Sequence, residues 1–261
     1  MEKTSAPLDG KVTLVTGAGG GIGKSICSEF ARLGSIVYMC DIADTSEVAE
    51  KINSQNGSNL AKPLSCDISS HEKVNEAHNL IEEKEGGIDI LVNNAAVQGP
   101  KGAQSFPEIS PEGFRKTFDI DLSGAVYWIL KALPHMKKQK WGRIIFSAAP
   151  LSSSGIPSPY LAGKSGFIGL TKHIGNKYQE YNIRTFSLVL RHVDTPMIRR
   201  VLASRNMDID KGIRKMHEKS LTGKMISPEE IARLYSFFAT APDECVKDLT
   251  LMSDGGITFL R

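Results

Sequence analysis

The sequence predicts an α/β fold in which one doubly wound parallel sheet carries helices on both faces. Short apolar runs alternate with longer amphipathic stretches along the chain. The apolar runs have the continuous character of strands that are buried on both sides. Since this alternation runs along almost the whole chain and no linker divides it, we expect residues 1–261 to form a single domain. Right-handed crossovers place the ligand crevice of such a sheet at the carboxyl ends of its strands.

The elements are expected in strict order. Buried strands are predicted at residues 12–16, 36–40, 60–66, 88–92, 143–147, 184–190 and 249–252. Helices are predicted between them at residues 21–33, 45–55, 71–84, 112–137, 159–178 and 228–239. Pro134 is expected to kink or end the fourth helix, and Ser227 before Pro228 is a typical helix start. The stretch 196–225 is rich in Lys, Arg and Met and interrupts the alternation, so we interpret it as a substrate lid over the crevice.

Composition excludes several classes of partner. The formal net charge is only +3, and no basic run suggests nucleic-acid binding. No apolar stretch approaches the ~20 residues that cross a membrane. The cysteines form no CxxC pair and are expected to be small core residues in a reducing compartment, so we predict a cytoplasmic protein without a metal site.

A glycine-rich loop follows the first predicted strand and opens the first helix. Gly17, Gly21 and Gly23, with Ile22 between the last two, allow a tight turn and a close backbone approach to a pyrophosphate. The free N–H groups and the partial positive charge of the helix N-terminus add to this. Glycines also serve as ordinary turns, but the strand–loop–helix context favours a dinucleotide site.

Two aspartates end the next two strands. Asp41 can accept hydrogen bonds from both ribose hydroxyls and would repel a 2′-phosphate, and no Arg or Lys follows it directly, which favours NAD over NADP. Asp67 could accept from the adenine amino group. The alternative for both residues is an ordinary cap or turn role.

Tyr160 and Lys164 are four residues apart, so they share one face of a predicted helix. A free tyrosine, with a pKa of ~10, is a poor base at neutral pH. A nearby ammonium and a positive nicotinamide ring both favour the phenolate, which could then exchange a proton with an alcohol or ketone. The alternative is a buried tyrosine beside an exposed lysine.

Motifs in one order along the chain carry a family resemblance. They are Thr16–Gly23, Asn93-Asn94-Ala95, Tyr160 with Lys164, Val193-Asp194-Thr195-Pro196-Met197 and Asp254-Gly255-Gly256. On these motifs the whole chain resembles the short-chain dehydrogenase/reductase family. The resemblance implies a Rossmann-type seven-stranded sheet, usually in a homotetramer, with a homodimer as the alternative. It also implies that Asn93 and Ala95 line the ribose and nicotinamide side, and that Val193 and Thr195 hold the carboxamide.

The sequence departs from the family pattern where a serine usually binds the substrate oxygen. Aligned from Gly142, that position is Ala149; counted back from Tyr160, it is Ser147. Ser147 is therefore the candidate, with Ser152 or Ser153 as substitutes. Losing one donor to a developing oxyanion costs on the order of 10²–10³ in rate, so the difference matters.

Other departures concern charge. Asp121 stands where the family usually has an asparagine that anchors a water near the lysine. Arg191 lies where a Pro-Gly pair is usual, and could clamp an anionic substrate or form a surface salt bridge. Ala96 replaces a usual glycine, a small change in backbone freedom.

The leading hypothesis is an NAD-dependent enzyme that interconverts a secondary alcohol and a ketone. Tyr160 is the predicted acid/base, Lys164 tunes it and binds ribose, and Ser147 orients the substrate oxygen. One alternative keeps the cofactor but changes the chemistry to that of an NAD-retaining epimerase, dehydratase or isomerase. The other alternative is a dinucleotide-binding subunit without catalysis.

Overall fold

A parallel sheet forms the centre of the protein, whose computed structural model describes residues 6–97, 109–150, 158–204, 206–242 and 248–255. Seven strands lie in the order β3-β2-β1-β4-β5-β6-β7, and every neighbouring pair is parallel. They are β1 (Val12–Thr16), β2 (Ile36–Asp41), β3 (Ala61–Ser65), β4 (Ile90–Asn93), β5 (Gly142–Ala148), β6 (Ile183–Leu190) and β7 (Asp248–Ser253). The predicted Rossmann-type fold is therefore confirmed.

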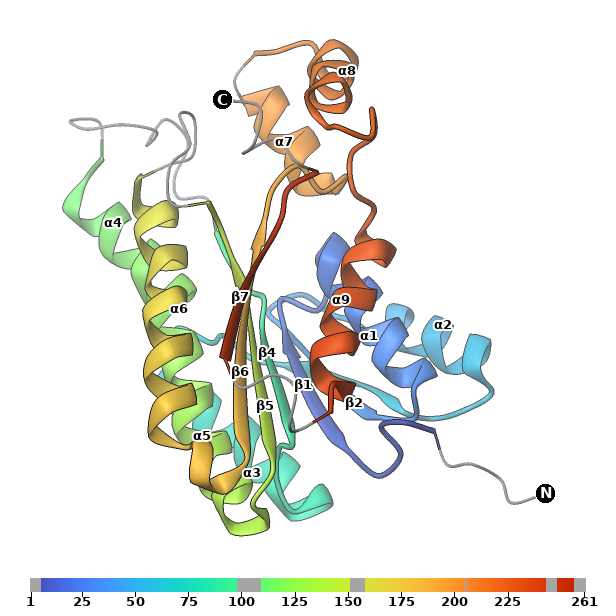
Figure 1. Cartoon of the computed structure of the whole chain (residues 1–261), viewed down its shortest axis with the longest axis vertical. Coiled ribbons are helices and arrows are strands. Elements are labelled where there is room, and N and C mark those ends of the chain that lie inside the picture. Colours follow the sequence, from blue (N-terminus) through green and yellow to red (C-terminus); the bar gives the residue numbers. More distant parts are fainter. Residues whose placement is uncertain (1–5, 98–108, 151–157, 205, 243–247, 256–261) are drawn as a thin grey trace.

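Helices cover both faces of the sheet (Figure 1). One layer holds α1 (Gly21–Arg32), α2 (Ser46–Asn56) and α9 (Pro228–Thr240), and the other holds α3 (His71–Glu85), α5 (Gly124–Gln139) and α6 (Ser158–Lys177). α4 (Pro111–Phe118) precedes α5 in the second layer. As expected, Ser227 caps α9: its hydroxyl accepts from the Glu230 N–H, and the Glu230 carboxylate accepts from the Ser227 N–H.

The helix predicted at 112–137 is present as unbroken helical backbone from Pro111 to Gln139, but its type changes in the middle. A π-helical turn, Asp119–Ser123, separates α4 from α5. Such turns widen the backbone and occur often at functional sites. Pro134 lies inside α5, which continues to Gln139, so the expectation that this proline ends the helix is wrong.

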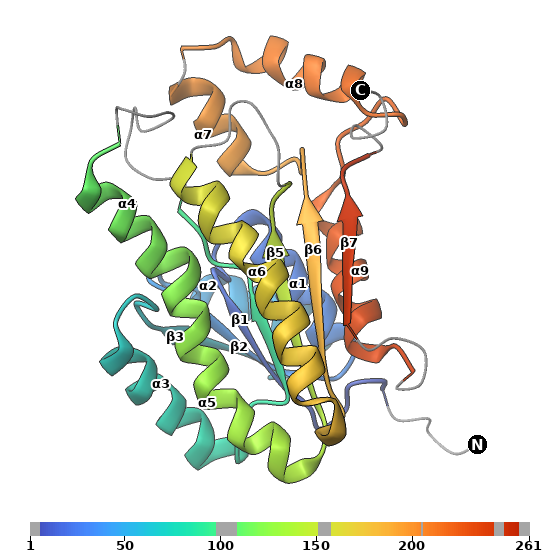
Figure 2. The same cartoon turned by 60° about the vertical axis from the view of Figure 1, so that its left-hand side comes forward.

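The stretch predicted as a lid contains two helices, α7 (Pro196–Ser204) and α8 (Ile209–Lys219). Both lie beyond the carboxyl ends of β6 and β7 (Figure 2). The loop 151–157, with Ser152 and Ser153, lies outside the described residues, as do Cys245 and Gly256.

The strand order determines where the ligand crevice lies on the sheet. Along the chain the sheet first grows outward from β1 to β3, and β4 then pairs with the other edge of β1. The loops after β1 and β4 therefore leave the sheet on opposite faces, which opens a crevice between them at the carboxyl edge. α7 and α8 lie above this edge (Figure 2).

Two apolar clusters, one on each face, fill the space between sheet and helices. Phe186 of β6 and Phe238 of α9 stack with their ring centroids 4.6 Å apart, and both are almost fully buried. Free thiols at Cys27, Cys40 and Cys66 are buried too, as expected of core residues. Within the described stretches, no helix has the length and apolar character needed to cross a membrane.

The orientation of α9 on the sheet can be tested with its two adjacent phenylalanines, Phe237 and Phe238. Phe238→Ala should lower the free energy of unfolding by about 3–5 kcal/mol, because it removes a fully buried ring and leaves a cavity. Its neighbour Phe237 is 52% exposed, so Phe237→Ala is the matched control and should cost about 1 kcal/mol or less. Denaturant unfolding at one protein concentration measures both. Equal losses would contradict this orientation of α9.

Candidate active site

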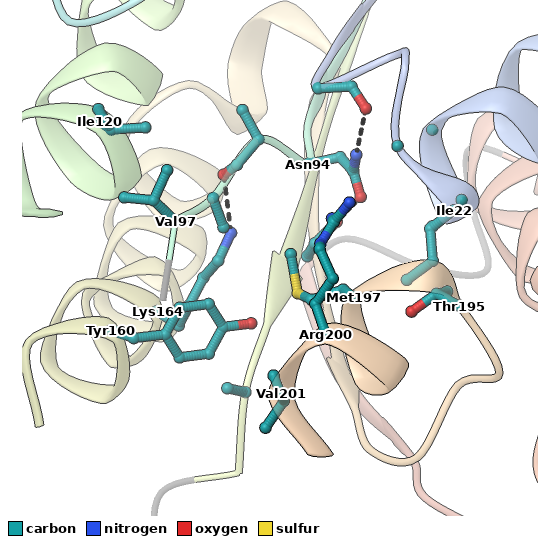
Figure 3. A pocket seen from close by; sticks show the side chains of 18 of the residues that line it. Ile22, Asn94, Val97, Ile120, Tyr160, Lys164, Thr195, Met197, Arg200 and Val201 are labelled. Carbon is teal, nitrogen blue, oxygen red and sulfur yellow. Dashed lines mark hydrogen bonds between the residues drawn. The ribbon is translucent and has the colours of Figure 1, made fainter. Parts of the chain in front are cut away.

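A cavity of about 1210 Å³ opens at the carboxyl edge of the sheet. Figure 3 shows Tyr160 and Lys164 on one wall, Ile22 and Thr195 on the opposite wall, and Arg200 reaching between them. Almost every residue that the sequence singles out lines this cavity. They are Gly17, Gly21, Ile22, Gly23, Asp41, Asp67, Ala95, Ser147, Tyr160, Lys164, Arg191, Val193 and Thr195. Asn93 is buried and is not among the lining residues, and its amide oxygen and nitrogen have no hydrogen-bond partner among the described residues.

The glycine loop has the shape of a cradle. Gly17 has a φ of +66°, and a Cβ there would lie 2.8 Å from the Cα of Ala95. A Cβ at Gly23 would overlap the carbonyl oxygen of Gly17. α1 then begins at Gly21 without a side-chain cap, so its first N–H groups are available to an anion. This loop fits a dinucleotide pyrophosphate.

Asp41 is held at the rim of the loop. Its Oδ2 accepts from the Gly19 N–H at 2.8 Å, and its Oδ1 accepts from the Ala43 N–H at 3.0 Å. Each carboxylate oxygen keeps a lone pair for a further donor. Asp67, also at the rim, accepts from the backbone and hydroxyl of Ser69, which is the turn role given above as its alternative.

Thr16 joins the loops after β1 and β4. Its hydroxyl oxygen accepts from the N–H groups of Asn94 and Ala95 at 3.0 and 3.1 Å. The amide of Asn94 in turn donates to the carbonyl oxygen of Thr16 at 3.0 Å. The two walls of the crevice are therefore fastened at one point.

Lys164 is 1% exposed, and its ammonium donates to the carbonyl oxygen of Ala95 at 3.1 Å. Burial lowers the pKa of Lys164, and the Asp121 carboxylate partly opposes this. Tyr160 lies one turn earlier on α6 with its hydroxyl directed into the crevice (Figure 3).

Burial raises the pKa of the Tyr160 phenol, and the Asp121 carboxylate raises it further. In the protein alone the pKa of Tyr160 is therefore raised, and the expected lowering by Lys164 and a positive nicotinamide ring stays a prediction. Burial disfavours the phenolate because it removes water from the charged form, and burial of this kind depends on tertiary packing.

Asp121 lies in the π-helical turn and is 1% exposed. Its Oδ1 accepts from the Val97 N–H at 2.7 Å, while its Oδ2 has no hydrogen-bond partner within the part of the chain that the structure describes. Burial raises the pKa of this carboxyl, and the Lys164 charge opposes that shift. The predicted proximity of Asp121 and Lys164 is thus present as an electrostatic interaction.

Ser147 lines the cavity near the end of β5. Its hydroxyl donates to Asn94 Oδ1 at 3.1 Å and shares a 2.6 Å hydrogen bond with the Tyr235 hydroxyl. The single proton of Ser147 is therefore engaged by Asn94. Binding a substrate oxygen through Ser147 would require this bond to break, and its role stays a prediction. Ala149, at the other candidate position, lines the cavity with a methyl group.

The loop after β6 completes the wall. Val193 and Thr195 are buried, and Val193 forms a bridge with Ile226. Arg191 lines the cavity, and its N–H donates to the Ser253 carbonyl oxygen. His192, which lies between Arg191 and Val193, also lines the cavity but was not among the predicted site residues. The sequence feature that could have indicated it is a bulky residue directly after the two positions where the family usually has Pro-Gly.

The fold and this crevice define an α/β protein whose glycine cradle fits a dinucleotide next to a tyrosine and a buried lysine. A profile of the family described as short chain dehydrogenase matches residues 11–206, and the chain belongs to this family. It is therefore an oxidoreductase by family, and the family binds a nicotinamide dinucleotide.

Among similar proteins is the mitochondrial borneol dehydrogenase of Lavandula x intermedia, 31% identical over 97% of this chain and 93% of that protein. The structure of levodione reductase has a TM-score of 0.89 at 23% identity, covering 97% of this chain and 100% of that one, and supports the fold alone. The 3-ketoacyl-(acyl-carrier-protein) reductase of Brucella melitensis, complexed with NADH, has a TM-score of 0.83 at 26% identity, with 96% and 99% covered.

Proposed function

We propose that the protein is an NAD-dependent oxidoreductase that interconverts a secondary alcohol and a ketone. The observation that carries this proposal is the pair of a half-buried Tyr160 and a buried Lys164, which line the same cavity as the glycine cradle. A phenol in that position can exchange a proton with a substrate oxygen next to the dinucleotide.

When bound, the dinucleotide supplies the hydride acceptor or donor and, in its oxidised form, a positive ring charge. In alcohol oxidation the Tyr160 oxygen takes the hydroxyl proton while the carbon–oxygen double bond forms. In ketone reduction it returns that proton to the developing alkoxide. Lys164, fixed on the Ala95 carbonyl oxygen, keeps its ammonium near the phenol and favours the phenolate.

NAD is proposed as the cofactor because of Asp41. Its carboxylate is held by two backbone N–H groups at the rim of the glycine loop, where a 2′-phosphate would meet a fixed negative charge. The segment that follows it, Ile42-Ala43-Asp44, offers no cation. The cradle at Gly17–Gly23, with Ile22, Asn93, Ala95, Val193 and Thr195, is proposed to hold the rest of the dinucleotide.

Cations at the lid end of the cavity favour an anionic substrate. Arg200 reaches into the crevice from α7 (Figure 3), and Lys215 and Lys219 line it from α8. The two lysines are four residues apart on one helix face, where like charges repel. In the described part of the chain, none of these three cations forms a salt bridge. An anion bound beside Arg191 and these cations would offset the repulsion.

One observation favours a second candidate, an NAD-retaining epimerase or dehydratase. Ala149 offers no donor, and the proton of Ser147 is engaged elsewhere, so the described residues differ from a standard alcohol-oxidising site. Tight retention of the dinucleotide through purification, without net NADH production, would favour this candidate.

We also propose a homo-oligomer, tetrameric or dimeric, that contacts itself through α5 and α6. The support is Leu130, a large apolar side chain that is 58% exposed on α5. The buried free thiols support a cytoplasmic location, since reducing compartments keep thiols unpaired.

The test of the proposed function is NADH production at 340 nm from purified protein, NAD and matched pairs of neutral and carboxylate-bearing secondary alcohols. Tyr160→Phe should lower kcat by about 10²–10⁴, because it removes the proton acceptor while keeping the ring. NADH affinity, measured by fluorescence, should persist. Tyr181→Phe, outside the cavity, is the control. Equal rates for Tyr160→Phe and wild type would refute the role, and a preference for neutral alcohols would refute the anionic class.

Asp41→Asn should shift the ratio of NAD to NADP affinity towards NADP by about tenfold, roughly 1.4 kcal/mol, because it removes a charge but keeps an acceptor for Gly19. Asp44→Asn is the matched control, since it removes the same charge three positions away. Equilibrium titration with both reduced cofactors measures the ratio. An unchanged ratio in Asp41→Asn would count against NAD selection by this carboxylate.

Asp121→Asn should move the acidic limb of the kcat/KM profile for alcohol oxidation to lower pH. The Asp121 carboxylate raises the Tyr160 pKa, so removing its charge lets the phenolate form at lower pH, while the amide can still accept from Val97. Asp119→Asn, in the same π-helical turn, is the control because Asp119 does not shift the Tyr160 pKa. A shift to higher pH would contradict this electrostatic reading.

A further inference from the structure

The substrate oxygen needs a hydrogen-bond donor besides Tyr160. Aligned from Gly142, the family's serine position falls on Ala149, which has only a methyl group, and the other candidate in the described residues, Ser147, donates its proton to Asn94. A developing oxyanion without a second donor is poorly stabilised. A second donor among the described residues must therefore come from another side chain that lines the cavity.

His192 lies at the same edge of the sheet as Ala149. It follows β6, which pairs with β5 up to the register of Val189 with Ala148. The residues just past these two strand ends are thus neighbours at one edge of the sheet. His192, Ala149 and Tyr160 all line the same cavity.

The backbone at His192 is held in an unusual conformation. Its φ is +51°, in the left-handed region that costs a non-glycine residue of order 1 kcal/mol or more. Both flanks are fixed: the Arg191 N–H donates to Ser253, Val193 bridges Ile226, and the Asp194 N–H donates to Ile226. The strained conformation is therefore imposed by neighbouring segments, and it determines where the imidazole lies.

The imidazole of His192 has an unmet hydrogen-bonding group. Its Nδ1 is buried and has no partner among the described residues. Buried polar atoms without a partner are rare in folded proteins. Because Nδ1 is shielded from the cavity, a hydrogen bond from this ring to a ligand in the cavity must come from Nε2.

The charges around His192 keep it neutral. Burial lowers its pKa to about 4, and the positive charges of Arg191 and Lys219 lower it too, against the opposing Asp254. A neutral imidazole carries one N–H donor and one acceptor nitrogen at every pH at which the enzyme would work. It can therefore donate a hydrogen bond without adding a titration to the reaction.

We propose that His192 donates a ring N–H hydrogen bond to the substrate oxygen, in the role that the family gives to a serine, while Tyr160 transfers the proton. This inference rests on the proposed alcohol–ketone chemistry. The substrate oxygen then has two hydrogen-bond partners, Tyr160 on α6 and His192 in the loop after β6. His192 makes and breaks no covalent bond, so the hydride and proton balance is unchanged.

The experiment compares two variants that both tolerate a positive φ. His192→Gly removes the donor and should lower kcat by about 10²–10³. His192→Asn keeps an N–H donor and should retain more of the activity. NADH affinity and melting temperature should stay close to wild type in both, because neither change touches the glycine cradle and neither strains the loop. The pH profile should keep its wild-type limbs.

A rescue and a rival variant complete the test. Ala149→Ser in the His192→Gly background restores a hydroxyl at the family position and should recover at least tenfold in kcat. Ser147→Ala should lose less than His192→Gly. An active wild type with His192→Gly within about threefold of its kcat would overturn the role of His192 and leave the proposed function standing, since one lost donor costs far more. A wild type without turnover on any alcohol would overturn both.

Discussion

The site depends on one hydroxyl at the point where the strand order reverses. The Thr16 side chain donates to the Val92 carbonyl oxygen and accepts from the N–H groups of Asn94 and Ala95. It thereby fixes the loop after β4 against the glycine loop that Thr16 itself begins. The Ala95 carbonyl oxygen then receives the ammonium of Lys164. The position of α6 relative to the glycine cradle therefore follows from contacts made at the end of β1.

Burial sets the electrostatics around that frame. Tyr160, Lys164 and Asp121 are ionisable and interact with one another, and burial disfavours the charged form of each. An isolated buried charge is unstable by several kcal/mol, so the Asp121 and Lys164 charges depend on each other. A carboxylate in the place of the family's asparagine therefore has two electrostatic effects. It favours the lysine ammonium and at the same time opposes the tyrosine phenolate.

The sequence predicted those parts of the structure that local residue patterns determine. The strands follow from apolar runs, and the cradle from glycines between a strand and a helix. Features that depend on distant segments escaped prediction. The π-helical turn at Asp119–Ser123 leaves the apolar periodicity almost intact, so the sequence suggests one long helix. The positive φ of His192 is imposed by contacts with Ser253 and Ile226, and the raised pKa of Tyr160 by tertiary burial. The roles of Ser147, Asp41 and Arg191 stay predictions.

The carboxyl ends of β5 and β6 are neighbours, and the hydrogen-bond donor missing at the end of β5 is proposed to come from the loop after β6. At the end of β5, Ala149 lacks a donor, and the Ser147 hydroxyl is drawn toward Tyr235 and Asn94. At the end of β6, the residue after Leu190-Arg191 is a histidine in a left-handed conformation with an orphaned nitrogen. The reacting oxygen needs a hydrogen-bond donor nearby, but this donor need not come from the end of one particular strand. What matters is that the donor is fixed before the charge develops, and the bonds on both sides of His192 provide that rigidity.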